Sequence, residues 1–221
     1  MKLYTYWRSS AAYRVRIGLS LKGQPYESVP VHLLRDGGEQ LKENYAKVNP
    51  QRQVPSMELD DGTILTQSLA ILEYLDETYP EPPLLPSEPV DRARVRALSQ
   101  VIACDIHPIN NLNVLNYLIN DMKVDPDNKV IWYRNTIEKG FPALEELLTR
   151  STKTGIFCHG DTPTLADVLL VPQVYNARRF DVDLSSFPTI CRIEAACLAL
   201  DSFRAAMPEA SSRRPQNLIR E

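Results

Sequence analysis

The chain has 221 residues, 43% of them hydrophobic, and a formal net charge of −3 from 25 basic and 28 acidic side chains. This composition is that of a globular protein of one or two domains, and it provides no basic field for nucleic acid or an anionic membrane surface. No apolar run approaches the ~20 residues of a membrane-spanning helix, and the first residues lack the profile of a signal peptide. We therefore expect a cytoplasmic protein without a nucleic-acid or membrane partner.

The cysteines and histidines have spacings that match neither a metal site nor a redox motif. We expect free, mostly buried thiols and no bound metal. The residues concerned are Cys104, Cys158, Cys191, Cys197, His32, His107 and His159.

Two serines stand at the first predicted helix start of the chain. An apolar strand at 3–6 precedes Ser9 and Ser10, and a helical pattern follows. The first N–H groups of a helix have no internal acceptor and carry partial positive charge, so a thiolate, phosphate or carboxylate is stabilised there. From the local pattern alone, a simple N-cap role for either serine is equally good. The apolar repeat of this helix is Ala11, Val15 and Leu19, while Arg14, Arg16 and Lys22 are polar.

The first eighty residues predict the element order β-α-β-α-β-β-α, which is that of a thioredoxin-like domain. After the first helix we expect a strand within 26–34, a short helix within 39–47 and a hairpin of strands at 56–59 and 63–65. Pro55 stands at the entry of the hairpin, where a cis peptide is an option. Gln67 and Ser68 open the next helix.

The remainder of the chain predicts helices only. Four prolines between Glu81 and Pro89 indicate a linker, which gives domains at 1–81 and 91–221 joined by 82–90. We expect a long helical segment at 92–122 with a break at Pro108, and a second one at 127–148, bent near Pro142. The last helices are expected at 165–174, opened by a capping box of Thr164 and Asp167, and at 189–200.

These motifs together resemble the zeta class of the cytosolic glutathione transferases. The resemblance extends over nearly the whole chain, with departures at Ala11 and Tyr13, where the family has cysteine and tryptophan. It implies an α+β two-domain glutathione transferase fold, with an N-terminal thioredoxin-like α/β domain and a C-terminal all-helical domain. The matching segments are 9–17, 49–55, 67–71, 105–111, 160–167 and 171–180.

The resemblance also implies glutathione as cofactor and a set of residues that bind it. Gln67 and Ser68 would hold the γ-glutamyl carboxylate, and the backbone of Val54, before a cis Pro55, would pair with the cysteinyl part. Ser9 or Ser10 would stabilise the thiolate. Further cofactor-binding positions are Gln40 and Gln53 for the glycine end, and His107 and Asn111 from the helical domain.

The implied activity is cis–trans isomerisation of maleylacetoacetate or maleylpyruvate in the breakdown of aromatic compounds. A thiolate adds to the conjugated double bond, the resulting single bond rotates, and elimination returns glutathione. The small dicarboxylate substrate needs cations, for which we choose Arg8 and Arg179, with Arg178 expected in solvent. The alternatives are a conjugating or dehalogenating enzyme for small α-halo acids and a non-catalytic adaptor. The family implies a homodimer.

Overall fold

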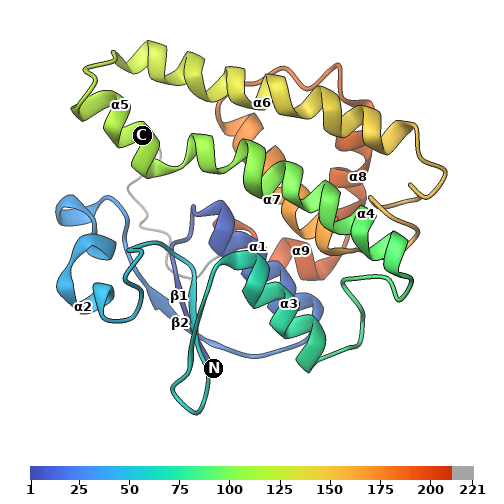
Figure 1. The fold of residues 1–221 in the computed structure, drawn as a ribbon, viewed down its shortest axis with the longest axis horizontal. Helices are drawn as coiled ribbons and strands as arrows, with labels where there is room; N and C mark the ends of the chain where they lie inside the picture. Colours follow the sequence, from blue (N-terminus) through green and yellow to red (C-terminus); the bar gives the residue numbers. More distant parts are fainter. Residues whose placement is uncertain (211–221) are drawn as a thin grey trace. The chain divides into compact units, whose positions relative to one another are not determined.

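The computed structural model describes residues 1–210, which divide into two compact units. The first contains Met1–Pro83 together with 199–210, and the second is Leu84–Leu198. The last described residues, 199–210, which the sequence analysis placed in the helical domain, therefore group with the N-terminal part. The reason is the packing of α9 (Asp201–Ala205) against α1 (Ser10–Leu21), and the two helices lie side by side in Figure 1.

The first unit contains a four-stranded sheet in the order β2-β1-β3-β4, with α1 and α3 packed against each other. Strand β1 is parallel to β2 and antiparallel to β3, and β3 and β4 form the predicted hairpin. This arrangement confirms the thioredoxin-like fold. The bounds are β1 Lys2–Thr5, β2 Glu27–Pro30, α2 Glu43–Ala46, β3 Ser56–Glu58, β4 Ile64–Thr66 and α3 Ser68–Thr78, with single 3₁₀ turns at Arg35–Gly37 and Glu39–Leu41.

Strand β2 is shorter than the stretch 26–34 that its sequence pattern suggested. Pro30, its last residue, has no N–H to donate to a neighbouring strand. Two residues later the His32 ring accepts hydrogen bonds from the backbone N–H groups of Leu34, at 3.2 Å, and Arg35, at 2.8 Å. These bonds turn the chain away from the sheet.

One of the apolar clusters of the first unit joins its sheet to α1 and α3. Each of its buried members contributes about 1.5–3 kcal/mol relative to an exposed position. Gly18 lets the two helices approach closely, because a Cβ atom there would lie 2.2 Å from a methyl carbon of Leu72 in α3. The fully buried members of this core are Leu3, Val15, Leu19, Met57, Ile71 and Leu75.

The described part of the second unit is helical, as predicted. Regular α-helical bonding ends at Gln100, earlier than the predicted break at Pro108, and a π-helical segment and a 3₁₀ turn follow. Helix α6 continues through Pro142 as one helix, and its Gly140 lets Ile106 of the π-helical segment approach. The bounds are α4 Pro89–Gln100, the π-helical segment Val101–Ile106, the 3₁₀ turn Pro108–Asn110, α5 Leu112–Asn120, α6 Pro126–Thr149, α7 Leu165–Arg179 and α8 Pro188–Leu198.

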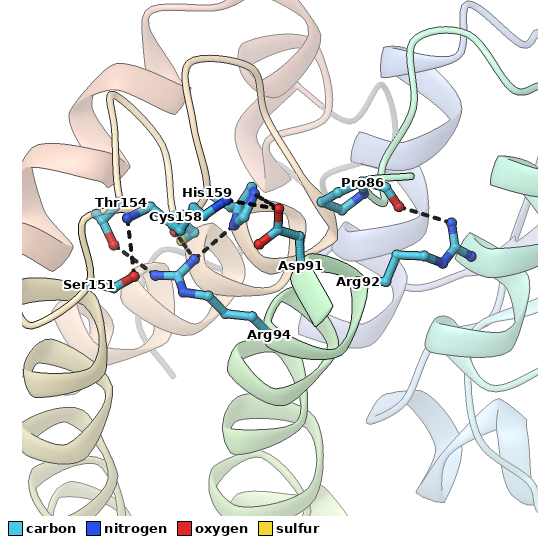
Figure 2. Close-up of polar contacts among 9 residues, drawn as sticks. Pro86, Asp91, Arg92, Arg94, Ser151, Thr154, Cys158 and His159 are labelled. Carbon is cyan, nitrogen blue, oxygen red and sulfur yellow. Dashed lines mark hydrogen bonds and ion pairs between the residues drawn. The ribbon is translucent and has the colours of Figure 1, made fainter. Parts of the chain in front are cut away.

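Arg94 of α4 bonds the loop at 151–161 and holds it against α4 (Figure 2). The Arg94 guanidinium donates to the Cys158 carbonyl at 2.9 Å and to the Thr154 hydroxyl at 2.8 Å, and lies 3.1 Å from His159 Nδ1. The loop leads to α7, so these bonds fix the entry into that helix.

The four cysteines are free thiols, but only two are buried, fewer than expected. Cys158 and Cys197 lie in the interior, Cys104 is exposed and Cys191 is half-buried. Within residues 1–210, no three His, Cys, Asp or Glu side chains form a group that could hold a metal ion. No helix in the same range is long and apolar enough to cross a membrane.

Candidate functional site

Ser9 is the N-cap of α1, and its hydroxyl oxygen accepts the N–H of Ala12 at 3.2 Å. The hydroxyl proton of Ser9 therefore remains available to a ligand acceptor. Ser10 is the first helical residue and is buried, whereas Ser9 is half-buried. The first turn of α1 contains no acidic residue, so its partial positive charge is not neutralised by its own side chains. This helix start is suited to an anion.

The start of α3 has the same character and is joined to α1 by a buried arginine. Ser68, 7% exposed, accepts a hydrogen bond of 3.2 Å from Nη1 of Arg14, itself 2% exposed. A guanidinium has donors only, so the Ser68 hydroxyl must point its own proton elsewhere. No acid occupies the first turn of α3 either. A carboxylate placed here would receive that proton and the first N–H groups of the helix.

Gln67, immediately before α3, has a left-handed backbone with φ of 67°. Such a conformation costs a non-glycine residue about 1–3 kcal/mol and is typical of binding sites. The side chain is exposed and does not cap the helix; its Nε2 donates to Gln51 Oε1 at 2.8 Å. The Gln67 amide therefore lies at the surface, next to the start of α3.

The peptide bond between Val54 and Pro55 is cis, as the family resemblance implied. Val54 precedes β3 by two residues and lies outside the registered pairing of that strand with β1 and β4. Its N–H and C=O are therefore not part of the sheet ladder. The loop is held by the Gln53 carbonyl, which accepts the Tyr45 hydroxyl at 2.6 Å and the Asn49 amide at 2.8 Å.

Gln40 is 5% exposed, and its Nε2 donates to the Leu33 carbonyl at 3.3 Å. Its Oε1 is buried and has no hydrogen-bond partner among the described residues. Gly38, with φ of 102°, lies so close that a Cβ atom would come within 2.8 Å of the Gln40 amide. One N–H of the Gln40 amide remains available to a carboxylate. The role of Gln40 in binding the glycine end of glutathione stays a prediction.

Arg8 lies between Trp7 and the serine pair, with its guanidinium carbon 5.3 Å from the Trp7 ring centre. It is half-buried and has no carboxylate partner within residues 1–210. Its charge is not neutralised by the described part of the chain.

Three predicted site residues belong to the second unit. His107 ends the π-helical segment, and Asn111 caps α5 by accepting the N–H of Asn113 at 3.2 Å. Arg179 lies in the last turn of α7, with its guanidinium carbon 4.6 Å from the ring centre of Phe180. Phe180 stacks on Tyr133 at 3.6 Å, and burial raises the pKa of Tyr133 to about 12. Asn111 thus has a structural cap role in addition to any ligand role.

Arg178 is exposed, as expected, and it also pairs with a carboxylate. It binds Glu194 of α8 through Nε, at 3.1 and 3.2 Å to the two carboxylate oxygens, and through Nη2. The Glu194 carboxylate is buried and needs a cation, and this hydrogen bond raises the pKa of Arg178.

The sequence pattern did not show that the two arginines of α1 and its C-cap lysine are buried. Arg14, Arg16 and Lys22 are 2%, 4% and 6% exposed. Lys22 pairs with Asp76 at 2.7 Å, and Arg16 donates to backbone carbonyl groups. Three cations within and just after a short helix ordinarily indicate positions in contact with solvent. The signal that could have shown otherwise is the adjacent serine pair, because a helix that presents its start to a ligand is covered on its remaining sides.

The fold and these two helix starts define a glutathione-binding domain of the transferase type. The family model "Glutathione S-transferase, N-terminal domain" matches residues 3–83. A probable maleylacetoacetate isomerase of Vibrio cholerae is 52% identical over 94% of this chain and 95% of its own length.

Two solved structures extend this likeness to the whole fold. One is a maleylpyruvate isomerase, described as a bacterial zeta-class glutathione transferase, with 47% identity, a TM-score of 0.94 and coverage of 97% of this chain and 100% of the other. The second is maleylacetoacetate isomerase from Methylobacterium extorquens AM1 with bound malonate and glutathione, with 42% identity, a TM-score of 0.93 and the same coverage. The chain belongs to the zeta class of the glutathione transferases.

Proposed function

We propose that this chain is a glutathione-dependent isomerase that converts maleylacetoacetate or maleylpyruvate into the fumaryl isomer. One observation carries the proposal: two helix starts, each with a serine hydroxyl whose proton is left for a ligand, are joined by buried Arg14. Glutathione has an anionic carboxylate and an ionisable thiol, and this pair of starts fits both. The relatives with these substrates in their names support the same reading.

Glutathione supplies the thiol, which as a thiolate adds reversibly to the substrate double bond. The chain supplies Ser68 and the start of α3 for the γ-glutamyl carboxylate, and the Val54 backbone for the cysteinyl part. The Ser9 hydroxyl donates a hydrogen bond to the sulfur, which is stabilised as an anion by the start of α1. A free thiol of pKa ~8.5 is about 3% ionised at pH 7, and a shift of ~2 units stabilises the thiolate by about 2.7 kcal/mol.

The substrate carries two carboxylates, and its charge calls for arginines. Arg8 is assigned to this role because it lies next to the serines and has no described carboxylate partner. Arg179 is assigned to it by family resemblance, as are His107, Asn111, Gln40 and Gln53 to the cofactor. Each arginine offers bidentate hydrogen bonds to a carboxylate or to oxygen that gains charge during the reaction.

The test is incubation of the protein with maleylacetoacetate or maleylpyruvate and glutathione, followed by proton NMR of the product. We expect the trans isomer, with glutathione unchanged. S-methylglutathione, whose sulfur cannot ionise, should bind and support no turnover. Release of halide from an α-halo acid without isomerisation of either enediacid would instead identify the dehalogenating alternative.

We also infer a cytoplasmic homodimer. Four free thiols are typical of a reducing compartment, and the dimer follows from the class. Sedimentation equilibrium of the purified chain tests the assembly, and a monomer at micromolar concentration would contradict it.

A further inference from the structure

Arg16 holds the backbone that leads into Ser9 from inside the first unit. Its Nη2 donates to the Trp7 carbonyl at 3.0 Å, and its Nη1 lies 3.4 Å from the Tyr6 carbonyl and 3.3 Å from the Thr5 hydroxyl. The Tyr6 carbonyl also accepts the N–H of Ser9 at 3.0 Å. The arginine and the N-cap serine therefore share one acceptor.

The same guanidinium reaches the far end of the described chain. Its Nε donates to the Ala206 carbonyl at 3.0 Å, one residue after α9 ends. The Tyr13 ring centre lies 5.2 Å from the guanidinium carbon. A side chain that is only 4% exposed thus connects β1, the turn before Ser9 and the segment after α9.

A buried cation is costly to fold around unless its donors are bonded, and an apolar side chain of similar volume would often serve stability equally well. The planar fork of arginine can bond several acceptors in fixed directions, which a lysine ammonium on a flexible stem does not reproduce. This geometry suits a residue that fixes a turn.

We propose that Arg16 is the positioning residue of the thiolate site, and that through it the segment around Ala206 supports the placement of Ser9. This inference rests on the proposed function. Its direct consequence concerns the sulfur: loosening the turn between Tyr6 and Ser9 displaces the hydroxyl and the start of α1, while Ser68 and α3 keep their bonds.

The test compares Arg16→Lys and Arg16→Met with wild type by titrating the thiolate absorbance of bound glutathione. We expect the thiol pKa to rise in both variants and turnover to fall about tenfold, with the Kd of S-methylglutathione changed less than twofold. Arg94→Lys is the matched control, since Arg94 likewise bonds a backbone carbonyl and a threonine hydroxyl, in the second unit (Figure 2). Arg94→Lys should leave the thiol pKa at the wild-type value.

An unchanged thiol pKa in folded Arg16→Lys and Arg16→Met would overturn the inference. Hydrogen exchange on the wild-type protein tests the role of Arg16 even where both variants fail to fold. S-methylglutathione should slow exchange at the start of α1 and at 203–207 together, and protection confined to α1 would contradict the link to Ala206. A wild-type protein that lowers the thiol pKa but isomerises neither enediacid would refute the proposed function and leave the role of Arg16 standing.

Discussion

The starts of α1 and α7 differ in how their unpaired N–H groups and partial positive charge are compensated. At α7, the Asp167 carboxylate accepts the N–H and the hydroxyl of Thr164, both at 2.8 Å, and the N–H of Cys158 at 2.8 Å. Asp167 has no exposed surface. At α1, the cap is the neutral Ser9 hydroxyl, and no acid follows in the first turn.

The difference separates a structural helix start from one left for a ligand. A carboxylate inside the protein completes the α7 start, although burial raises the pKa of Asp167 and its hydrogen bonds to Cys158 and Thr164 oppose that rise. The start of α1 leaves the negative charge to be supplied from outside. A capping motif therefore indicates function only where the chain itself does not provide the anion.

Removal of the α7 carboxylate should produce the largest effect. Asp167→Ala leaves the buried donors of Cys158, Thr164 and Cys197 without their acceptor, and we expect a loss of about 3–5 kcal/mol in the free energy of unfolding. Urea unfolding followed by circular dichroism measures it. Asp161→Ala is the control, because Asp161 is exposed and, among residues 1–210, accepts the Ile156 N–H alone, at 3.0 Å; it should cost less than about 1 kcal/mol. Equal losses for the two variants would contradict the distinction between the two starts.

Removal of the α1 cap should affect chemistry more than stability. Ser9→Ala is expected to lower kcat/KM between about tenfold and a hundredfold, and stability by only about 1 kcal/mol, because the hydroxyl caps the helix and, in the proposed mechanism, donates a hydrogen bond to sulfur. Ser10→Ala removes a buried neighbour and should lower kcat/KM less. Steady-state kinetics with either enediacid measure both variants. A larger loss of kcat/KM in Ser10→Ala than in Ser9→Ala would assign the thiolate contact to Ser10 instead.

The element order and the helix starts could be predicted because they are local. Periodicity located the strands and helices, and Thr164 and Asp167 are only three residues apart. The burial of α1 could not be predicted in this way. Arg14 bonds Ser68, 54 residues away, and Arg16 bonds Ala206, 190 residues away. Whether a cation faces solvent or an interior carbonyl depends on which distant element covers it.

The same limit explains Arg178 and the site as a whole. Two adjacent arginines end α7, and only the position of Glu194 on the next helix decides that Arg178 is paired. The proposed glutathione-binding residues were chosen by family resemblance, since glutamine and serine at a helix start are not specific for a ligand.

Ligand binding at the start of α3 should change the free energy of unfolding by less than the Asp167 substitution does. At a concentration of S-methylglutathione 100 times its Kd, the wild-type protein gains about 2.7 kcal/mol. Ser68→Ala, which loses the donor that Arg14 orients, should bind about tenfold more weakly and gain only about 1.4 kcal/mol at the same concentration. Thermal unfolding with and without ligand measures both gains. Ser99→Ala is the control, because that buried hydroxyl donates to the Val95 carbonyl within α4; an equal reduction there would contradict a specific role for Ser68.

The smallest effect is expected from pH. It concerns the stability of the loop that leads to the start of α7. His159 follows Cys158, and its Nδ1 faces the Arg94 guanidinium at 3.1 Å. Burial lowers the pKa of His159, Arg94 and Lys153 lower it further, and Asp91 opposes them. With a folded pKa below 6.5, the unfolded chain binds the proton more readily, so stability from the neutral ring is present above that value and is lost as pH falls through the folded pKa. Urea midpoints at pH 7, 6 and 5 should fall less steeply for His159→Gln than for wild type. A steeper fall in the variant would mean that protonation strengthens the contact with Asp91, 3.9 Å away, more than it weakens the contact with Arg94.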